Sequence, residues 1–254
     1  MKMKCIVSVL SALILCQTVR AADDKENNNL CKDLPSHAQL VAALKAVVDV
    51  GGTNNSGFGL NMWATIVNRD GEVCSVAFSG RDRGDQWPGS RVISAQKANT
   101  ANAFSLPGLA LSTANLYTAV QPGGTLFGLQ HSNPVDTETA YKGPSKNNGQ
   151  HNDPMVGRKS GGVNVFGGGL ALYNNKGKLV GALGVSGDTS CTDHIVAWKL
   201  RKALGMDYVP AGVSPTGDDN MVHDPASGWF HPVCGADQKA IVEALPVTHP
   251  TSDP

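Results

Sequence analysis

Apolar residues change their spacing several times along the chain, and the order of these changes restricts the fold class. Residues 40–48 space leucine and valine as one face of a helix does. Over residues 58–66 every second residue is apolar, which is the period of a strand. The Asp70-Gly71 turn then leads into another apolar run, so we expect a β-hairpin.

Helical spacing returns after this hairpin, and another hairpin and helix follow. Residues 90–104 are rich in alanine, so we expect a helix that can approach its neighbour closely. Residues 162–187 predict the next hairpin, with Gly167–Gly169 at a bulge or a close backbone approach. Residues 189–204 predict an amphipathic helix that Gly205 ends.

The order of helix, hairpin, helices, hairpin and helix predicts an α+β domain with a mainly antiparallel sheet. The strict alternation of strand and helix that a dinucleotide-binding domain requires is absent from the sequence. Neither GGTNNSG nor FGGGL continues into a phosphate-binding motif, so we interpret their glycines as turn or bulge positions.

The first 21 residues have the composition of a secretory signal peptide. Lys2 and Lys4 precede the apolar run CIVSVLSALIL, and a small-residue exit predicts cleavage after Ala21. A membrane anchor is the weaker alternative, because polar residues interrupt a run that is already short for a span. A lipoprotein site at Cys16 is weaker still, because the bulky Leu15 precedes it. We therefore expect a periplasmic or secreted protein with no membrane span.

Cysteine usage agrees with export, and the charge composition bears on possible partners. The predicted mature chain keeps Cys31, Cys74, Cys191 and Cys234, an even number that suits disulfides in an oxidising compartment. Of the three possible pairings we favour Cys31 with Cys234, which leaves Cys74 with Cys191. Cleavage removes three of 21 basic residues and leaves 18 against 21 acidic ones, so we expect no nucleic-acid partner. No C-x-x-C-H motif for covalent haem attachment is present.

Two segments lack regular spacing. Residues 131–161 contain many turn-forming residues and predict a long loop, which in a compact domain is often functional. Residues 211–254 hold six of the fourteen prolines and predict an irregular tail packed on the domain, with a short helix around 236–245. The expected organisation is therefore a signal peptide over 1–21, one domain over 22–210 and this tail.

Four stretches in a fixed order together resemble the GlcG/HbpS-type haem-binding family, in its secreted branch. They are GLNMWATIVNRDGEVCSVAFSG, VISAQKANTANAF, QPGGTLFGLQ and FGGGLALYNNKGKLVGALGVSGDTSCTDHIVAW. The resemblance covers residues 40–204. It implies a profilin-like, three-layer α-β-α domain that forms homo-oligomers and binds haem non-covalently, with some members linked to haem degradation or sensing.

The chain also departs from the family pattern. The 131–161 loop, the tail and the cysteines are additions, so the family's residue-level haem contacts are not carried over to this chain. The candidate site residues are instead chosen for their chemistry, because haem iron needs an axial ligand with a lone pair and the macrocycle needs an apolar slot.

His194 is the first candidate for the haem iron ligand. It lies in the first turn of the predicted 189–204 helix, where the helix dipole favours a neutral imidazole. Asp188 or Asp193 would orient the ring or cap the helix. The alternative is a partly buried structural histidine.

The other candidates also have structural alternatives. Cys191 at the same helix start is the second candidate iron ligand, although a disulfide suits an exported chain better. His131 and His151 bracket the long loop, which would close over a bound ring, or they are surface histidines. Lys97 and Arg91 on the alanine-rich helix would neutralise haem propionates, or they are solvated.

We therefore expect an exported haem-binding protein that captures, stores or senses haem, or another small planar ligand, with haem degradation as a possible reaction. One alternative is a lyase or isomerase for a small aromatic or hydroxy-acid metabolite, with His194 as base and the glycine-rich backbone as an anion cradle. Another is a non-catalytic assembly module. A flat apolar slot would favour haem, and a small polar pocket would favour the enzyme.

Overall fold

The computed structural model describes residues 30–253. The chain divides into two units, Met1–Asp33 and Leu34–Pro254, and the fold reported below is that of the second. The predicted signal peptide, residues 1–21, lies outside the described residues. Within the described part, no helix combines the length and the apolar character that crossing a membrane requires.

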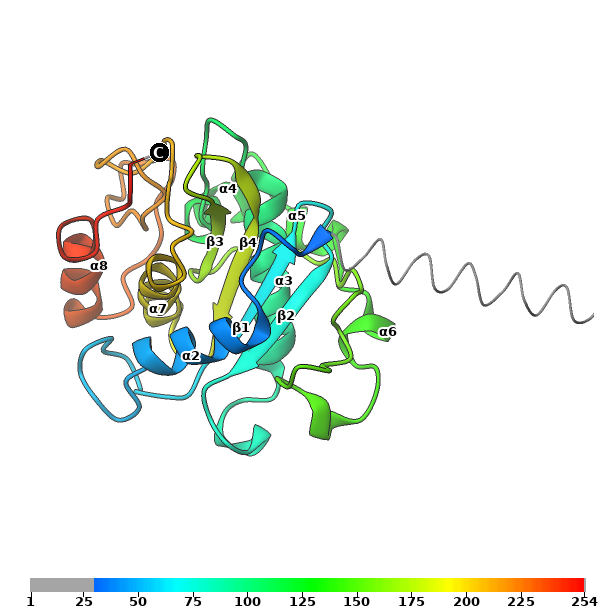
Figure 1. Ribbon diagram of the computed structural model, residues 1–254. Helices are drawn as coiled ribbons and strands as arrows, with labels where there is room; N and C mark the ends of the chain where they lie inside the picture. The colour runs from blue at the N-terminus through cyan, green and yellow to red at the C-terminus, as the bar shows by residue number, and fades with distance from the viewer. Residues whose placement is uncertain (1–29, 254) are drawn as a thin grey trace, which may run out of the picture. The chain divides into compact units, whose positions relative to one another are not determined.

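The second unit alternates helices with two antiparallel hairpins (Figure 1). In chain order its elements are α2 (His37–Val47), β1 (Trp63–Asn68), β2 (Val73–Phe78), η1 (Arg83–Asp85), α3 (Gly89–Phe104), η2 (Thr113–Leu116), α4 (Tyr117–Val120), α5 (Leu129–Ser132), α6 (Thr137–Ala140), η3 (Ser145–Asn147), β3 (Gly169–Tyr173), β4 (Leu179–Ser186), α7 (Ser190–Ala203) and α8 (Ala236–Thr248), where η marks a 3₁₀ helix.

The four strands form one antiparallel sheet in the order β2-β1-β4-β3. Each hairpin contributes two neighbouring strands, and β1 pairs with β4 to join them. The sheet has helices on both faces. Apolar residues of α2, α7 and α8 share one core with one face of the sheet, and α3 shares another core with the opposite face. The predicted α+β, three-layer α-β-α architecture is therefore confirmed.

Strand β1 shows how alternation serves both cores. Ala64 and Ile66 of β1, with Met62 just before the strand, belong to the core on the α2 and α7 side, whereas Trp63 and Val67 belong to the core under α3. The alternation predicted over 58–66 is thus confirmed from residue 62 onward.

The prediction that this strand begins at residue 58 is wrong, because β1 begins at Trp63. Phe58 is 67% exposed and lies in a turn, because Gly57 and Gly59 on either side of it have positive φ angles. Its amide donates to the carboxylate of Asp188. The alternation of apolar residues in the sequence therefore begins at residue 58, several residues before the backbone forms a strand.

The small side chains of α3 allow this helix to lie very close to β4. Ala95, Ala98 and Ala101 are completely buried. A Cβ atom added at Gly184 of β4 would overlap the carbonyl oxygen of Ser94 and would lie 2.5 Å from the amide nitrogen of Ala98. The close approach expected of the alanine-rich helix is therefore confirmed, and Gly184 is a residue of β4 that permits it.

The 131–161 segment is packed against the domain. Asp153 forms a buried ion pair with Arg91 of α3, and Met155 is completely buried in the core under α3. The guanidinium of Arg91 also donates to the carbonyl oxygen of Ala140. The sequence predicted a loop that closes over a ligand, whereas the structure shows a segment that the domain holds in place.

The tail is anchored by charge and by a disulfide. Arg201 of α7 makes two hydrogen bonds to the buried carboxylate of Asp219, each 2.7 Å long. Cys191 is bonded to Cys234, with a Cα–Cα distance of 6.0 Å. The pairings that we favoured are therefore wrong, because the tail returns past the N-terminus of α7 and brings Cys234 to Cys191. Cys31 and Cys74 are disulfide-bonded as well.

A Gly184→Ala substitution should destabilise the domain by at least about 2 kcal/mol, because backbone atoms of α3 occupy the space that the new methyl group needs. Gly89→Ala is the matched control, since Gly89 is the first residue of α3 and no atom lies within 4 Å of a Cβ built there. It should change the free energy of unfolding by no more than about 0.5 kcal/mol or should stabilise the domain slightly. Denaturant unfolding with intact disulfides measures both values, and equal effects would contradict the close packing.

Candidate functional site

His194 is part of the protein core. Its imidazole has no exposed surface, and Nε2 lies 3.2 Å from the amide nitrogen of Met221 and 3.2 Å from Oδ1 of Asn220. Burial is the main cause that lowers its pKa to about 3. The ring is therefore neutral, as expected, but burial is the cause and no face of the ring is open to a ligand. The structural alternative describes His194 better than the iron-ligand hypothesis does.

Lys97 and Asp193 form a buried ion pair. Nζ of Lys97 lies 2.7 Å from Oδ2 of Asp193 and also donates to the carbonyl oxygen of Val185. The other carboxylate oxygen accepts the amides of Gly187 and Asp188 at 2.9 Å. Burial raises the pKa of Asp193 to about 6, and the nearby Lys97 ammonium opposes this rise. Asp193 therefore binds Lys97 and the turn before α7, and it does not orient His194.

The remaining predicted residues do not form a site with His194. Lys97 and Arg91 are both buried in ion pairs, so neither side chain is available to bind a propionate. Cys191 is in a disulfide and is not a thiolate. His131 and His151 are both exposed on the packed 131–161 segment.

The glycine run at the start of β3 provides close packing. A Cβ atom at Gly168 would lie 3.2 Å from Nζ of Lys97, and one at Gly167 would overlap the carbonyl oxygen of Ser190. The amide of Gly167 donates to Ser190 Oγ, and that of Gly169 donates to Thr113 Oγ1. The close backbone approach is confirmed, and these two amides have partners within the protein.

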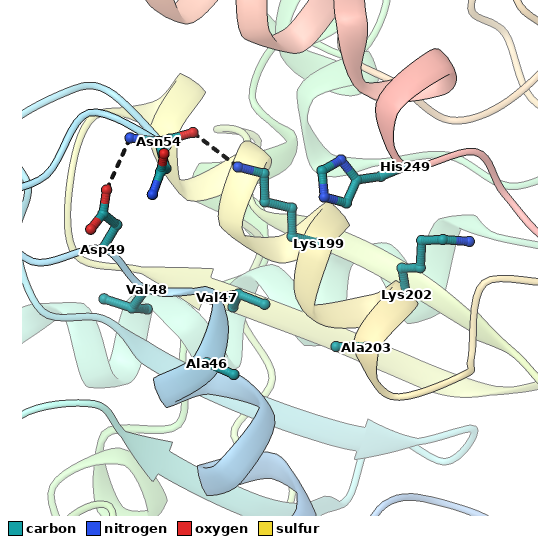
Figure 2. A pocket seen from close by; sticks show the side chains of 9 residues that line it. All are labelled: Ala46, Val47, Val48, Asp49, Asn54, Lys199, Lys202, Ala203 and His249. Carbon is teal, nitrogen blue, oxygen red and sulfur yellow. Dashed lines mark hydrogen bonds between the residues drawn. The ribbon is translucent and has the colours of Figure 1, made fainter.

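The structure contains a groove that the sequence did not predict, between the end of α2 and the C-terminal half of α7. We call it the His249 groove. Its volume is about 600 Å³, and it is lined by Ala46, Val47, Val48, Asp49, Asn54, Lys199, Lys202, Ala203 and His249. Figure 2 shows the imidazole of His249 beside Lys199 and Lys202, with the apolar residues at the end of α2 across the groove.

Hydrogen bonds hold the two lysines of the groove in place. Nζ of Lys199 donates to the carbonyl oxygen of Asn54 at 2.9 Å and to Oδ1 of Asn55 at 2.8 Å. Nζ of Lys202 donates to the carbonyl oxygen of Pro250 at 2.6 Å and lies 3.3 Å from Oδ2 of Asp207. Each ammonium keeps a further N–H donor for a ligand, since a lysine has three.

His249 is half-buried at the wall of the groove. Its Nδ1 lies 2.9 Å from the hydroxyl of Thr248. Burial lowers the pKa of His249, and the positive charges of Lys199 and Lys202 lower it further. The imidazole is therefore neutral at neutral pH, which is the form that binds a metal.

Local spacing contains no signal for this groove. His249 follows α8, whereas Lys199 and Lys202 belong to α7 and Val47 belongs to α2. The position of His249 is set by contacts such as the 2.8 Å hydrogen bond from the indole of Trp198 to its carbonyl oxygen. The only hint in the sequence is a histidine between two prolines, Pro246 and Pro250, in a tail that otherwise reads as irregular.

Comparison with known proteins gives a family match and two structural likenesses. The profile of the family described as "Haem degrading protein HbpS-like" matches residues 36–201. The crystal structure of a PduOC:heme complex is 25% identical, with a TM-score of 0.43, over 65% of this chain and 89% of that chain. Klebsiella pneumoniae protein ORFY is 24% identical, with a TM-score of 0.43, over 67% and 90% of the two chains. No curated protein matches the sequence.

Burial of neutral His194 should make stability depend on pH. Its folded pKa of about 3 lies below the unfolded value of 6.5, so the unfolded chain binds the proton more readily between these values. Stability from this residue is therefore complete above pH 6.5 and is lost as the pH falls. Between pH 7.5 and pH 5 the loss should be about 2 kcal/mol.

His194→Gln should remove this part of the pH dependence. Urea unfolding at the two pH values should show a slope that is smaller in the variant by about 2 kcal/mol, whatever the variant costs at pH 7.5. The raised pKa of Asp193 acts in the opposite direction, but Asp193 is present in both proteins and its contribution cancels. Equal slopes would show that His194 titrates normally in the folded protein.

Proposed function

Since the chain belongs to the HbpS-like family of haem-degrading proteins, we propose that it binds haem non-covalently in the His249 groove. The observation that carries the proposal is the half-buried imidazole of His249, placed beside two lysines and opposite apolar side chains. Haem needs an axial ligand, an apolar surface for the ring and positive charges for its propionates. The groove offers each of these three.

The residues of the groove fit the group in size and in chemistry. A volume of about 600 Å³ lies within the range of small-molecule sites, which runs from roughly 300 to 1,000 Å³. Val47, Val48 and Ala203 supply apolar surface. Lys199 and Lys202 favour the neutral form of His249 and would also attract carboxylates. When bound, haem would supply its own redox chemistry, and the protein would hold and orient it.

His249 thus replaces His194 as the proposed iron ligand, and Lys199 and Lys202 replace Lys97 and Arg91 as the proposed partners of the propionates. The reason is access. His194, Lys97 and Arg91 are all buried, and the two cationic side chains are held in ion pairs within the core. The groups of the groove lie at its surface.

We further propose that the protein acts after export, in the capture, storage or sensing of haem. The predicted signal peptide over residues 1–21 supports export, and so does the use of cysteines in disulfides, which persist in oxidising compartments. Homo-oligomer formation, which the family resemblance implies, belongs to the same proposal.

The metabolite lyase or isomerase has less support. It would need His194 as a base and the glycine-rich backbone as an anion cradle. His194 has no exposed surface, and the amides of Gly167 and Gly169 donate to side chains of the protein. Haem binding is therefore the function that the described residues support better.

Titration of hemin into the purified mature chain, with intact disulfides, should give a saturable Soret shift at about one haem per chain. His249→Ala should weaken binding at least about tenfold and displace the Soret band, because the axial ligand is lost. His131→Ala is the matched control, since His131 is an exposed histidine outside the groove. It should bind as the unchanged protein does, and so should His194→Gln.

The lysines can be tested in the same titration. A Lys199→Ala, Lys202→Ala double variant should bind haem more weakly while the Soret position stays the same, because the iron ligand remains and only the partners of the propionates are lost. A Soret shift that is indifferent to His249 and to both lysines would overturn the site. The absence of any shift would overturn the proposed function.

A further inference from the structure

A serine and a histidine meet at the N-terminus of α7, away from the groove. Ser190 is the first residue of α7 and is partly exposed, and His231 belongs to the tail. The hydroxyl of Ser190 lies 2.8 Å from Nε2 of His231. The two residues are 41 positions apart in the sequence, so no local sequence motif predicts the pair.

The hydrogen bonds of His231 determine which ring nitrogen carries the proton. Nδ1 lies 2.7 Å from the carbonyl oxygen of Pro232, which can only accept. Nδ1 therefore holds the proton and donates it, and in the neutral ring Nε2 carries a lone pair that accepts the hydroxyl of Ser190. Burial is the main cause that lowers the pKa of His231 to about 4, so the neutral form prevails at pH 7.

The surroundings of Ser190 stabilise negative charge on its oxygen. The amide of Gly167 donates to Oγ at 2.7 Å. The serine also lies at the positive end of the dipole of a 14-residue helix. The hydroxyl of Ser190 thus has a histidine acceptor on one side and an amide donor on the other. This is the arrangement of an activated nucleophile.

Two further contacts hold the pair together. The disulfide joins Cys191, the residue after Ser190, to Cys234, three residues after His231. The ring of Tyr117 lies against the imidazole, with 5.0 Å between the ring centroids. Both segments that carry the pair are therefore fixed relative to each other.

We propose that Ser190 and His231 form a nucleophile and base pair that hydrolyses small uncharged carboxylic esters. Ser190 Oγ would bond to the ester carbonyl carbon while its proton passes to Nε2 of His231, and His231 would return that proton to the leaving alkoxide as the C–O bond breaks. Water would then attack the acyl-serine and lose a proton to His231, which would pass it to Ser190 Oγ as the carboxylic acid leaves.

Exposed aromatic residues that lie close in the sequence to Gly167 and His231 indicate the substrate class. Phe166 precedes Gly167 and is 43% exposed, and Trp229 lies two residues before His231 and is 36% exposed. Such side chains suit an apolar acyl or aryl group. Ser190 is nine residues before Lys199, or about 14 Å along the helix axis, so the pair is separate from the His249 groove.

The test is hydrolysis of p-nitrophenyl acetate by the full mature chain without haem. Turnover should fall at least about 100-fold in Ser190→Ala and in His231→Gln, and Ser227→Ala should keep it. Ser227 is the matched control because it is a partly exposed serine of the tail whose hydroxyl accepts the amide of Trp229 and forms no hydrogen bond to a histidine in the described structure. Thermal unfolding of each variant separates loss of activity from loss of fold.

Covalent labelling gives a readout that a structural hydrogen bond would not produce. A fluorophosphonate should add once per chain, on the peptide that contains Ser190, in the unchanged protein and in Ser227→Ala but not in Ser190→Ala. Turnover should also fall below about pH 4 as His231 gains a proton. No turnover and no label, or turnover that survives in Ser190→Ala, would overturn the proposal. Neither result depends on whether haem binds.

Discussion

The buried ion pair between Lys97 and Asp193 connects the layers on the two sides of the sheet. Lys97 belongs to α3 and Asp193 to α7, and the ammonium also binds the carbonyl oxygen of Val185 at the end of β4. The carboxylate in turn accepts the amides of the turn that leads from β4 into α7. Because either charge alone in this position would cost several kcal/mol, the pair holds the start of α7 against α3 and the end of β4.

Helix α7 then organises the two regions for which we propose chemistry. Its first residue, Ser190, meets His231, and the disulfide of Cys191 holds the tail there. Its C-terminal half carries Lys199 and Lys202, which form the groove with α2 and His249. The tail passes both ends of this helix, so each proposed site combines one helix of the family domain with a histidine from the tail.

Much of the fold was predictable because it depends on local spacing. The hairpins, the alanine-rich helix and the 189–204 helix follow from apolar periods, and the structure places that last helix at Ser190–Ala203. The site was predicted less well. His194 was correctly expected near the start of a helix and in its neutral form, but spacing alone does not distinguish a buried ring from an exposed one. The prediction that Phe58 belongs to a strand was wrong because the glycines on either side of it have positive φ angles, which apolar spacing does not reveal.

The sequence by itself determined the fold class, the family and the close approach of α3 to the sheet, because these depend on neighbouring residues and on the absence of side-chain volume at glycine and alanine. Only the tertiary structure decided which charges are paired, which cysteines are bonded and which histidines are open. Those properties depend on contacts between residues far apart in the sequence, such as Cys191 with Cys234, 43 positions apart, and Lys97 with Asp193, 96 positions apart. The tail brings His231 and His249 to α7. Outside α8 it has no periodic spacing from which its path could be predicted.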